Sequence, residues 1–143
     1  MTKEEKELLL KDLCARLPYG VKCIVTKSRT EEGQKGDVGR IAYVCLEGVE
    51  CIGDTPFFSE FGYFKSYLFP LLSMTDEQYK EFNRIIGWDG DIEEIRRGKF
   101  SFIGYIGIDY IYDTIDWLNK NHFDYRGLIE KGLAIDASGL NIY

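Results

Sequence analysis

Residues 40–46 read Arg-Ile-Ala-Tyr-Val-Cys-Leu, a run that is apolar on both faces of an extended chain. A strand that is apolar on both faces is typical of the interior of a sheet, because a strand with one face in water alternates apolar and polar residues. The run therefore predicts a central strand, and its neighbours in sequence are expected to pair with it.

Strands are predicted on both sides of this run. Residues 21–28 are rich in β-branched side chains, and a polar, glycine-containing loop at 29–37 leads from them into 40–46. The apolar residues on the inward face of 21–28 are Val21, Cys23 and Val25. Glu47-Gly48 predicts a turn into a short strand at 49–52.

Two helices are predicted from capping boxes, in which a Thr at the N-cap pairs with Glu or Gln three residues later. Thr2 and Glu5 begin a helix that is expected to end at Pro18-Tyr19-Gly20, and Thr75 and Gln78 begin one that stops at Gly87. The predicted buried faces are Leu9, Leu10, Leu13, Cys14 and Leu17 in the first helix, and Tyr79, Phe82, Ile85 and Ile86 in the second.

The remaining elements are predicted in the second half of the chain. They are a short helix at 91–98, a strand at 100–106, a helix from an Asp109 cap to near Asn121, helical turns at 125–131 and an edge strand at 133–135. The helix that begins at Asp109 is expected to bury Ile111, Ile115 and Leu118, while 56–72 allows no assignment. Together these elements predict one α+β domain over 1–143: a small antiparallel sheet of about four or five strands with three or four helices packed on it.

Composition excludes several classes of function. The net charge is −6, with −1 in residues 1–71 and −5 in residues 72–143. An acidic chain without a basic stripe argues against nucleic-acid binding and against docking on anionic lipid. No segment resembles a secretory signal or approaches the ~20 apolar residues of a membrane span, so we expect a cytoplasmic protein.

Cofactor and metal motifs are absent from the sequence. One His and four dispersed Cys lack the paired spacing of a zinc site, so the cysteines are interpreted as reduced thiols. No phosphate-binding glycine loop is present. We therefore expect no metal and no cofactor.

The only histidine, His122, raises an enzymatic alternative. With Asp124 or a cysteine it could serve a small hydrolase or transferase as a general base. No nucleophile signature supports this hypothesis. A histidine near a helix C-terminus is also favoured electrostatically, without any catalytic role.

The segment 57–69 is the most unusual part of the chain, with seven aromatic residues in thirteen positions. Such residues fill cores, and they also dominate recognition hot spots. The candidate binding residues are Phe57, Phe58, Phe61, Tyr63, Phe64, Tyr67, Trp117, Tyr125 and Arg126. They favour a non-enzymatic interaction protein whose partner is another protein.

The carboxylates of Asp109, Asp113 and Asp116 recur at helical spacings of four and three. A solvated helix face explains them best. A third possible function, suggested by the net charge of −5 in residues 72–143, is that of an acidic mimic of nucleic acid, which would need carboxylates spaced like phosphates along one face.

Two stretches carry a resemblance to a known family. Residues 66–75 (Ser-Tyr-Leu-Phe-Pro-Leu-Leu-Ser-Met-Thr) and 116–129 (Asp-Trp-Leu-Asn-Lys-Asn-His-Phe-Asp-Tyr-Arg-Gly-Leu-Ile), with Gly-Leu-Ala-Ile at 132–135, resemble an uncharacterised family of gut anaerobic bacteria, their phages and mobile elements. The family form of the first stretch is Pro-Tyr-Leu-Arg-Pro, whereas this chain has Ser66 and Phe69 at the Pro and Arg positions. The resemblance implies a cytosolic accessory protein of phage or prophage origin and assigns no catalytic residue.

Overall fold

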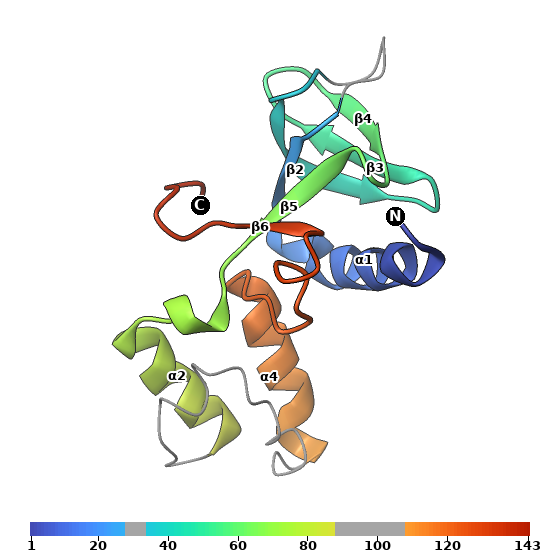
Figure 1. Ribbon diagram of the computed structural model, residues 1–143. Helices are drawn as coiled ribbons and strands as arrows, with labels where there is room; N and C mark the ends of the chain where they lie inside the picture. Colours follow the sequence, from blue (N-terminus) through green and yellow to red (C-terminus); the bar gives the residue numbers. More distant parts are fainter. Residues whose placement is uncertain (28–33, 88–107) are drawn as a thin grey trace.

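The computed structural model describes residues 1–27, 34–87 and 108–143, which form an α+β fold as predicted. A six-stranded sheet runs in the order β4-β3-β2-β1-β5-β6, slightly larger than expected (Figure 1). The strands are β1 (Lys22–Val25), β2 (Val38–Val44), β3 (Gly48–Ile52), β4 (Phe57–Glu60), β5 (Phe64–Leu68) and β6 (Ala134–Asp136). The run that predicted a central strand is the interior strand β2.

The sheet is mixed and not purely antiparallel, which corrects the prediction. Strands β1 to β5 pair antiparallel, but β6 joins the edge parallel to β5, with Ser66 opposite Ala134. Parallel neighbours need a long crossover connection. The described part of the chain between Leu68 and Ala134 contributes helices α2 (Asp76–Ile86) and α4 (Ile108–Lys120) to that crossover before it returns to the sheet at β6.

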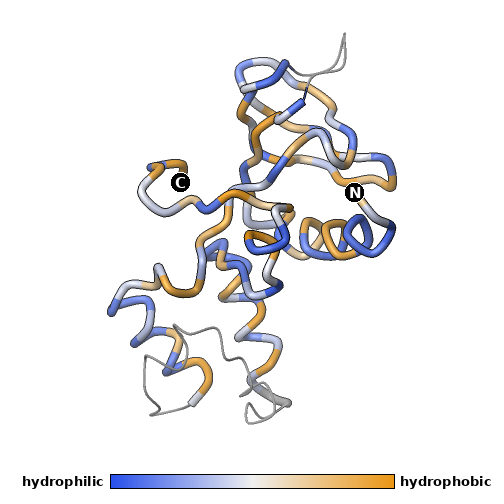
Figure 2. The backbone as a smooth tube through the Cα atoms, viewed as in Figure 1, coloured by the Kyte–Doolittle hydropathy of each residue, from blue (hydrophilic) through white to orange (hydrophobic). Residues whose placement is uncertain are grey.

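Helix α1 (Lys3–Arg16) begins with the predicted capping box and continues into a 3₁₀ turn, Leu17–Tyr19, that stops at Gly20. It packs on one face of the sheet, where Leu9 and Leu13 are completely buried. Hydrophobic and hydrophilic residues alternate along this helix (Figure 2). The predicted face is partly wrong, since Cys14 is exposed and Asp12 and Arg16 are buried in its place.

Helices α2 (Asp76–Ile86) and α4 (Ile108–Lys120) pack against each other below the sheet in Figure 1. They share a second hydrophobic cluster, whose buried members are Leu71, Met74, Phe82, Ile86, Trp117, Leu118 and Phe123. This arrangement corrects the expectation that all helices lie on the sheet. Each cluster buries apolar surface of its own, and the segment after β5 joins them.

Several predicted boundaries are corrected. Helix α4 already includes Ile108, so Asp109 is not its N-cap. Ile115 is 38% exposed, because the buried side of α4 runs through Thr114, Trp117 and Leu118. The helix at 91–98 and the strand at 100–106 lie outside the described residues.

Residues 125–131 form turns instead of a helix. Gly127 and Gly132 adopt left-handed backbone conformations, with φ of 68° and 69°. The Asp124 carboxylate accepts hydrogen bonds from the backbone N–H groups of Leu128 and Ile129, at 2.9 and 2.8 Å. These features hold a compact turn in front of the edge strand β6.

Candidate functional site

The predicted binding residues divide between the core and the surface. Phe64, Tyr67 and Trp117 are buried, at 2%, 6% and 6% exposed. The other six candidates are half-buried: Phe57, Phe58, Phe61, Tyr63, Tyr125 and Arg126. The aromatic segment is thus mainly the strand pair β4 and β5, and three of its seven rings, those of Phe57, Phe61 and Phe64, belong to the first cluster or pack against it.

The strand registers place a different set of residues together on the sheet face opposite α1. Lys65, Ile24 and Val38 form one row across β5, β1 and β2. Lys22, Arg40 and Ile52 form a second row across β1, β2 and β3. Tyr43, Glu50 and Phe58 form a third across β2, β3 and β4. We call these nine residues the outer sheet face.

The outer sheet face combines exposed apolar side chains with positive charge. Val38, Ile52 and Tyr43 are 42%, 50% and 55% exposed. These nine residues include three cations and one carboxylate, that of Glu50, and the adjoining Gly48–Glu60 pair of β3 and β4 adds the Glu60 carboxylate to the same side. The three cations therefore slightly outnumber the carboxylates on this side, although the whole chain has a net charge of −6. Apolar patches with polar surroundings mark interaction sites, so this face is the strongest candidate surface.

The segment 137–143 covers one end of this face, next to β5. The Tyr143 hydroxyl donates to the carbonyl of Tyr67 at 2.8 Å and accepts from the Lys22 backbone N–H at 3.0 Å. The Lys22 Nζ donates to the Ile142 carbonyl at 2.6 Å. Burial raises the pKa of Tyr143 to about 12, so its hydroxyl stays protonated and both hydrogen bonds persist at neutral pH. Ile24, Val38, Arg40 and Ile52 lie beyond this segment.

The inner face of the sheet, in contrast, is closely packed. Cys23 of β1 and Cys51 of β3 are buried with their Sγ atoms 3.1 Å apart, although β2 lies between their strands. They meet over Gly39 of β2, where a Cβ would approach the Cys51 Cβ and a ring carbon of Phe57 at 3.0 Å each. The hydrogen bond to Cys51 and burial raise the pKa of Cys23, which favours the protonated thiol over the thiolate.

Arg126 and Tyr125 belong to a charged cluster that ties α1 to the turn at 122–126. Arg16 is completely buried; its Nε donates to the Asp12 carboxylate and its Nη2 to the Phe123 carbonyl, both at 2.7 Å. The Arg126 Nε lies 3.3 Å from the other Asp12 oxygen. The guanidinium groups of Arg16 and Arg126 also lie 5.3 and 4.9 Å from the Tyr125 ring. These contacts assign both predicted binding residues to the internal cluster, although each keeps some exposure.

His122 is buried at 8% exposure and adopts a left-handed backbone, with φ of 59°. Its ring stacks on Tyr143, with centroids 3.9 Å apart and planes at 13°. Burial, followed by the positive charges of Arg16 and Lys22, lowers the pKa of His122 to about 4. The imidazole is therefore neutral at pH 7.

The contacts of Asp124 and His122 do not favour the enzymatic alternative. The Asp124 carboxylate is occupied by the two backbone N–H groups of the turn that follows it. The His122 Nδ1 is buried and has no hydrogen-bond partner among the described residues. Within that part of the chain, no described hydrogen bond joins His122 to Asp124 or to a cysteine.

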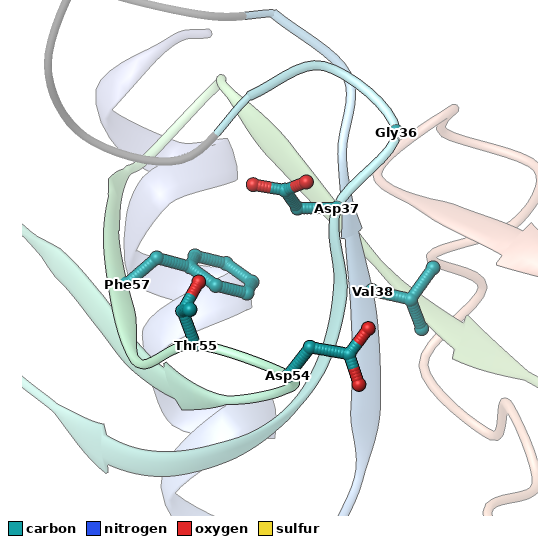
Figure 3. A pocket seen from close by; sticks show the side chains of 6 residues that line it. All are labelled: Gly36, Asp37, Val38, Asp54, Thr55 and Phe57. Carbon is teal, nitrogen blue, oxygen red and sulfur yellow. The ribbon is translucent and has the colours of Figure 1, made fainter.

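A pocket of about 280 Å³ opens at one end of β2. It is lined by Gly36, Asp37, Val38, Asp54, Thr55 and Phe57 (Figure 3). Asp37 and Thr55 lie beside the Phe57 ring, while Val38 points away from them, consistent with its place on the outer sheet face. The lining includes neither His122 nor a cysteine, so the pocket does not complete the predicted catalytic group.

The described part of the chain has neither a candidate metal site nor a candidate membrane span. Within residues 1–27, 34–87 and 108–143, no three His, Cys, Asp or Glu side chains gather where they could hold a metal ion. None of the helices in these ranges is long and apolar enough to cross a membrane.

Comparison with protein-family models, with curated proteins and with solved structures gives no match for this chain. The family resemblance of residues 66–75 and 116–135 therefore stays a prediction.

Sequence reasoning missed the outer sheet face because its members are dispersed between Lys22 and Lys65. The usable signal is the alternation within β2, where Val38, Arg40 and Ala42 are exposed and Gly39 and Ile41 are buried. Interpreting 40–46 as apolar on both faces hid that alternation. Only the strand registers show that the cations of β1, β2 and β5 share one face.

Proposed function

We propose that the chain is a non-enzymatic interaction protein that binds another protein through the outer sheet face. The observation that carries the proposal is the exposure of Ile52 and Val38 on a face where the cations Lys22, Arg40 and Lys65 outnumber the carboxylates of Glu50 and Glu60. A monomer seldom leaves contiguous apolar side chains in water without an interaction to make. The family resemblance adds the proposal that the protein is a cytosolic accessory factor of phage or prophage origin.

The chemistry of the face defines the kind of partner. Its aliphatic side chains would bury against apolar side chains of the partner, and its cations would meet carboxylates. Electrostatic complementarity of this kind sets orientation and association rate, while the apolar centre supplies most of the affinity. The expected partner surface is therefore acidic and partly apolar.

Site-specific photo-crosslinking in the native host tests this proposal. A photoreactive phenylalanine analogue replaces Ile52 or Val38 on the outer sheet face. As a control it replaces Leu72, which is 64% exposed in the turn before α2. We expect one discrete cross-linked protein from Ile52 and Val38 that is absent from the Leu72 sample.

Charge reversal adds a second arm to the same experiment. Arg40→Glu with Lys65→Glu should abolish the cross-link from Ile52, because Arg40 lies opposite Ile52 in the same row and Lys65 is the cation of the neighbouring row. Lys11→Glu with Lys131→Glu, at exposed positions outside the face, should leave it intact. Equal cross-linking from Ile52 and Leu72, or a cross-link that survives reversal on the face, would overturn the proposal.

A further inference from the structure

Helix α4 carries a surface whose chemistry is opposite to that of the outer sheet face. Tyr112 is 78% exposed and Ile115 is 38% exposed, and the exposed carboxylates of Asp113 and Asp116 lie beside them on the helix. Spacings of three and four residues put Tyr112, Ile115 and Asp116 on one side of the helix. We call these four residues the α4 acidic face.

The two faces are complementary in charge, and one is a helix face and the other a sheet face. The outer sheet face sets Ile24, Val38 and Ile52 among cations, and the α4 acidic face sets Tyr112 and Ile115 among carboxylates. A helix laid on a sheet is one of the standard ways of covering an exposed sheet face, and α1 covers the inner face in this manner. The chain thus displays both halves of one complementary contact.

We infer that the partner seated on the outer sheet face is a second copy of this chain, docked through its α4 acidic face. This inference rests on the proposed function and supplies the occupant that it requires. The contact joins two different surfaces, so it is heterologous. Each added copy leaves one sheet face and one helix face free, and association continues with rising concentration unless a ring closes.

Sedimentation velocity over a range of concentrations tests the inference, at low salt and at ~0.5 M NaCl. The full chain should show an average mass that rises with concentration at low salt and falls toward the monomer at high salt, because salt screens exposed charges. Arg40→Glu with Lys65→Glu should leave a monomer. Tyr112→Lys with Asp113→Lys should do the same; Asp116 is left intact because it accepts a hydrogen bond from the Tyr19 hydroxyl.

Mixing the two reversed variants separates a specific contact from general loss of solubility or folding. Each variant alone should be monomeric. Their equimolar mixture should associate again, since the unchanged helix face of the first variant meets the unchanged sheet face of the second, and the two reversed faces are also complementary. Lys11→Glu with Lys131→Glu is the control and should associate like the original chain. Circular dichroism confirms that every variant is folded.

The outcomes distinguish this inference from the proposed function. A chain that stays monomeric at all concentrations at low salt, while Ile52 still cross-links to a different protein in the host, overturns self-association and leaves the proposed function standing. Association that persists in both reversed variants, or a mixture that fails to associate, also overturns it. Failure of every cross-link from the outer sheet face removes the proposed function itself.

Discussion

The two faces of the same sheet differ in how strictly packing restricts the residue at each position. On the inner face, Gly39, Cys23 and Cys51 meet at contact distance, and α1 completes the cluster with Leu9 and Leu13. On the outer face, Ile52 and Val38 remain about half exposed. Side chains in the first environment are set by packing, whereas those in the second can change at little cost to stability. Residues that stability does not require there are the ones free to serve an interaction.

The largest expected effect lies at the buried end of α1. Asp12→Ala removes the carboxylate partner of the fully buried Arg16 and should destabilise the protein by about 3–5 kcal/mol, because an unpaired buried charge is left behind. The free energy of unfolding from urea titrations measures the loss.

The same helix offers the control for this prediction. Lys3 and Glu7 form an equally spaced pair at 3.9 Å whose side chains are 84% and 57% exposed. Glu7→Ala should therefore change stability by less than about 0.5 kcal/mol. Equal losses of stability in the two variants would show that the buried Asp12–Arg16 pair contributes no more to stability than the exposed Lys3–Glu7 pair.

The next-largest effect on stability is expected at Gly39 of β2, over which the Cys23 and Cys51 thiols meet. Gly39→Val adds a branched side chain where even a Cβ would contact the Cys51 Cβ and Phe57 at 3.0 Å, and the Ile52 carbonyl oxygen at 3.1 Å. Overpacking of this kind should cost about 3 kcal/mol in thermal or urea unfolding.

Strand β2 also supplies the matched position for Gly39. Ala42 is exposed on the same strand, and Ala42→Val should be close to neutral there, since valine suits a strand. A neutral Gly39→Val variant would mean that the inner face is less tightly packed than the contacts indicate.

The sequence predicted the elements with strong local signals. The capping boxes at Thr2 and Thr75, the helix stop at Gly87 and the interior position of β2 are confirmed. The burial of Asp12 and Arg16 could not be predicted, because charged side chains are read as exposed unless a distant partner such as the Phe123 carbonyl is known. The outer sheet face could not be predicted for the same reason, because its residues come together only through pairing between strands.

A third prediction concerns pH and the buried His122. Its pKa is about 4 in the folded chain against an ordinary 6.5, so the unfolded chain binds the proton more readily. The histidine therefore has no effect on stability above pH ~6.5. As the pH falls from ~6.5 toward 4.5, protonation of this histidine in the unfolded chain should lower the free energy of unfolding by about 2 kcal/mol. Urea midpoints at pH 7 and 4.5 measure the change.

The His122→Asn variant isolates the contribution of the imidazole. Asparagine tolerates the left-handed backbone at this position. The variant should lose less stability than the original chain over the same pH interval, by about 2 kcal/mol, because only the carboxylates then titrate. Identical pH dependence in the two chains would show that His122 is accessible to protons in the folded state, contrary to its burial.

The smallest expected effect is at the outer sheet face, and it separates folding from interaction most directly. Ile52→Ala should lower the free energy of unfolding by less than about 0.5 kcal/mol, because the side chain is already half in water. The buried Ile41 of β2 lies on the opposite side of the sheet, and Ile41→Ala should cost about 2–5 kcal/mol. If Ile52 serves an interaction, Ile52→Ala should keep the unfolding midpoint of the original chain. It should nevertheless lose the salt-sensitive association through the outer sheet face. A loss of stability at Ile52 comparable to that at Ile41 would mean that both faces of the sheet are core, and the outer face would then have no surface left to offer a partner.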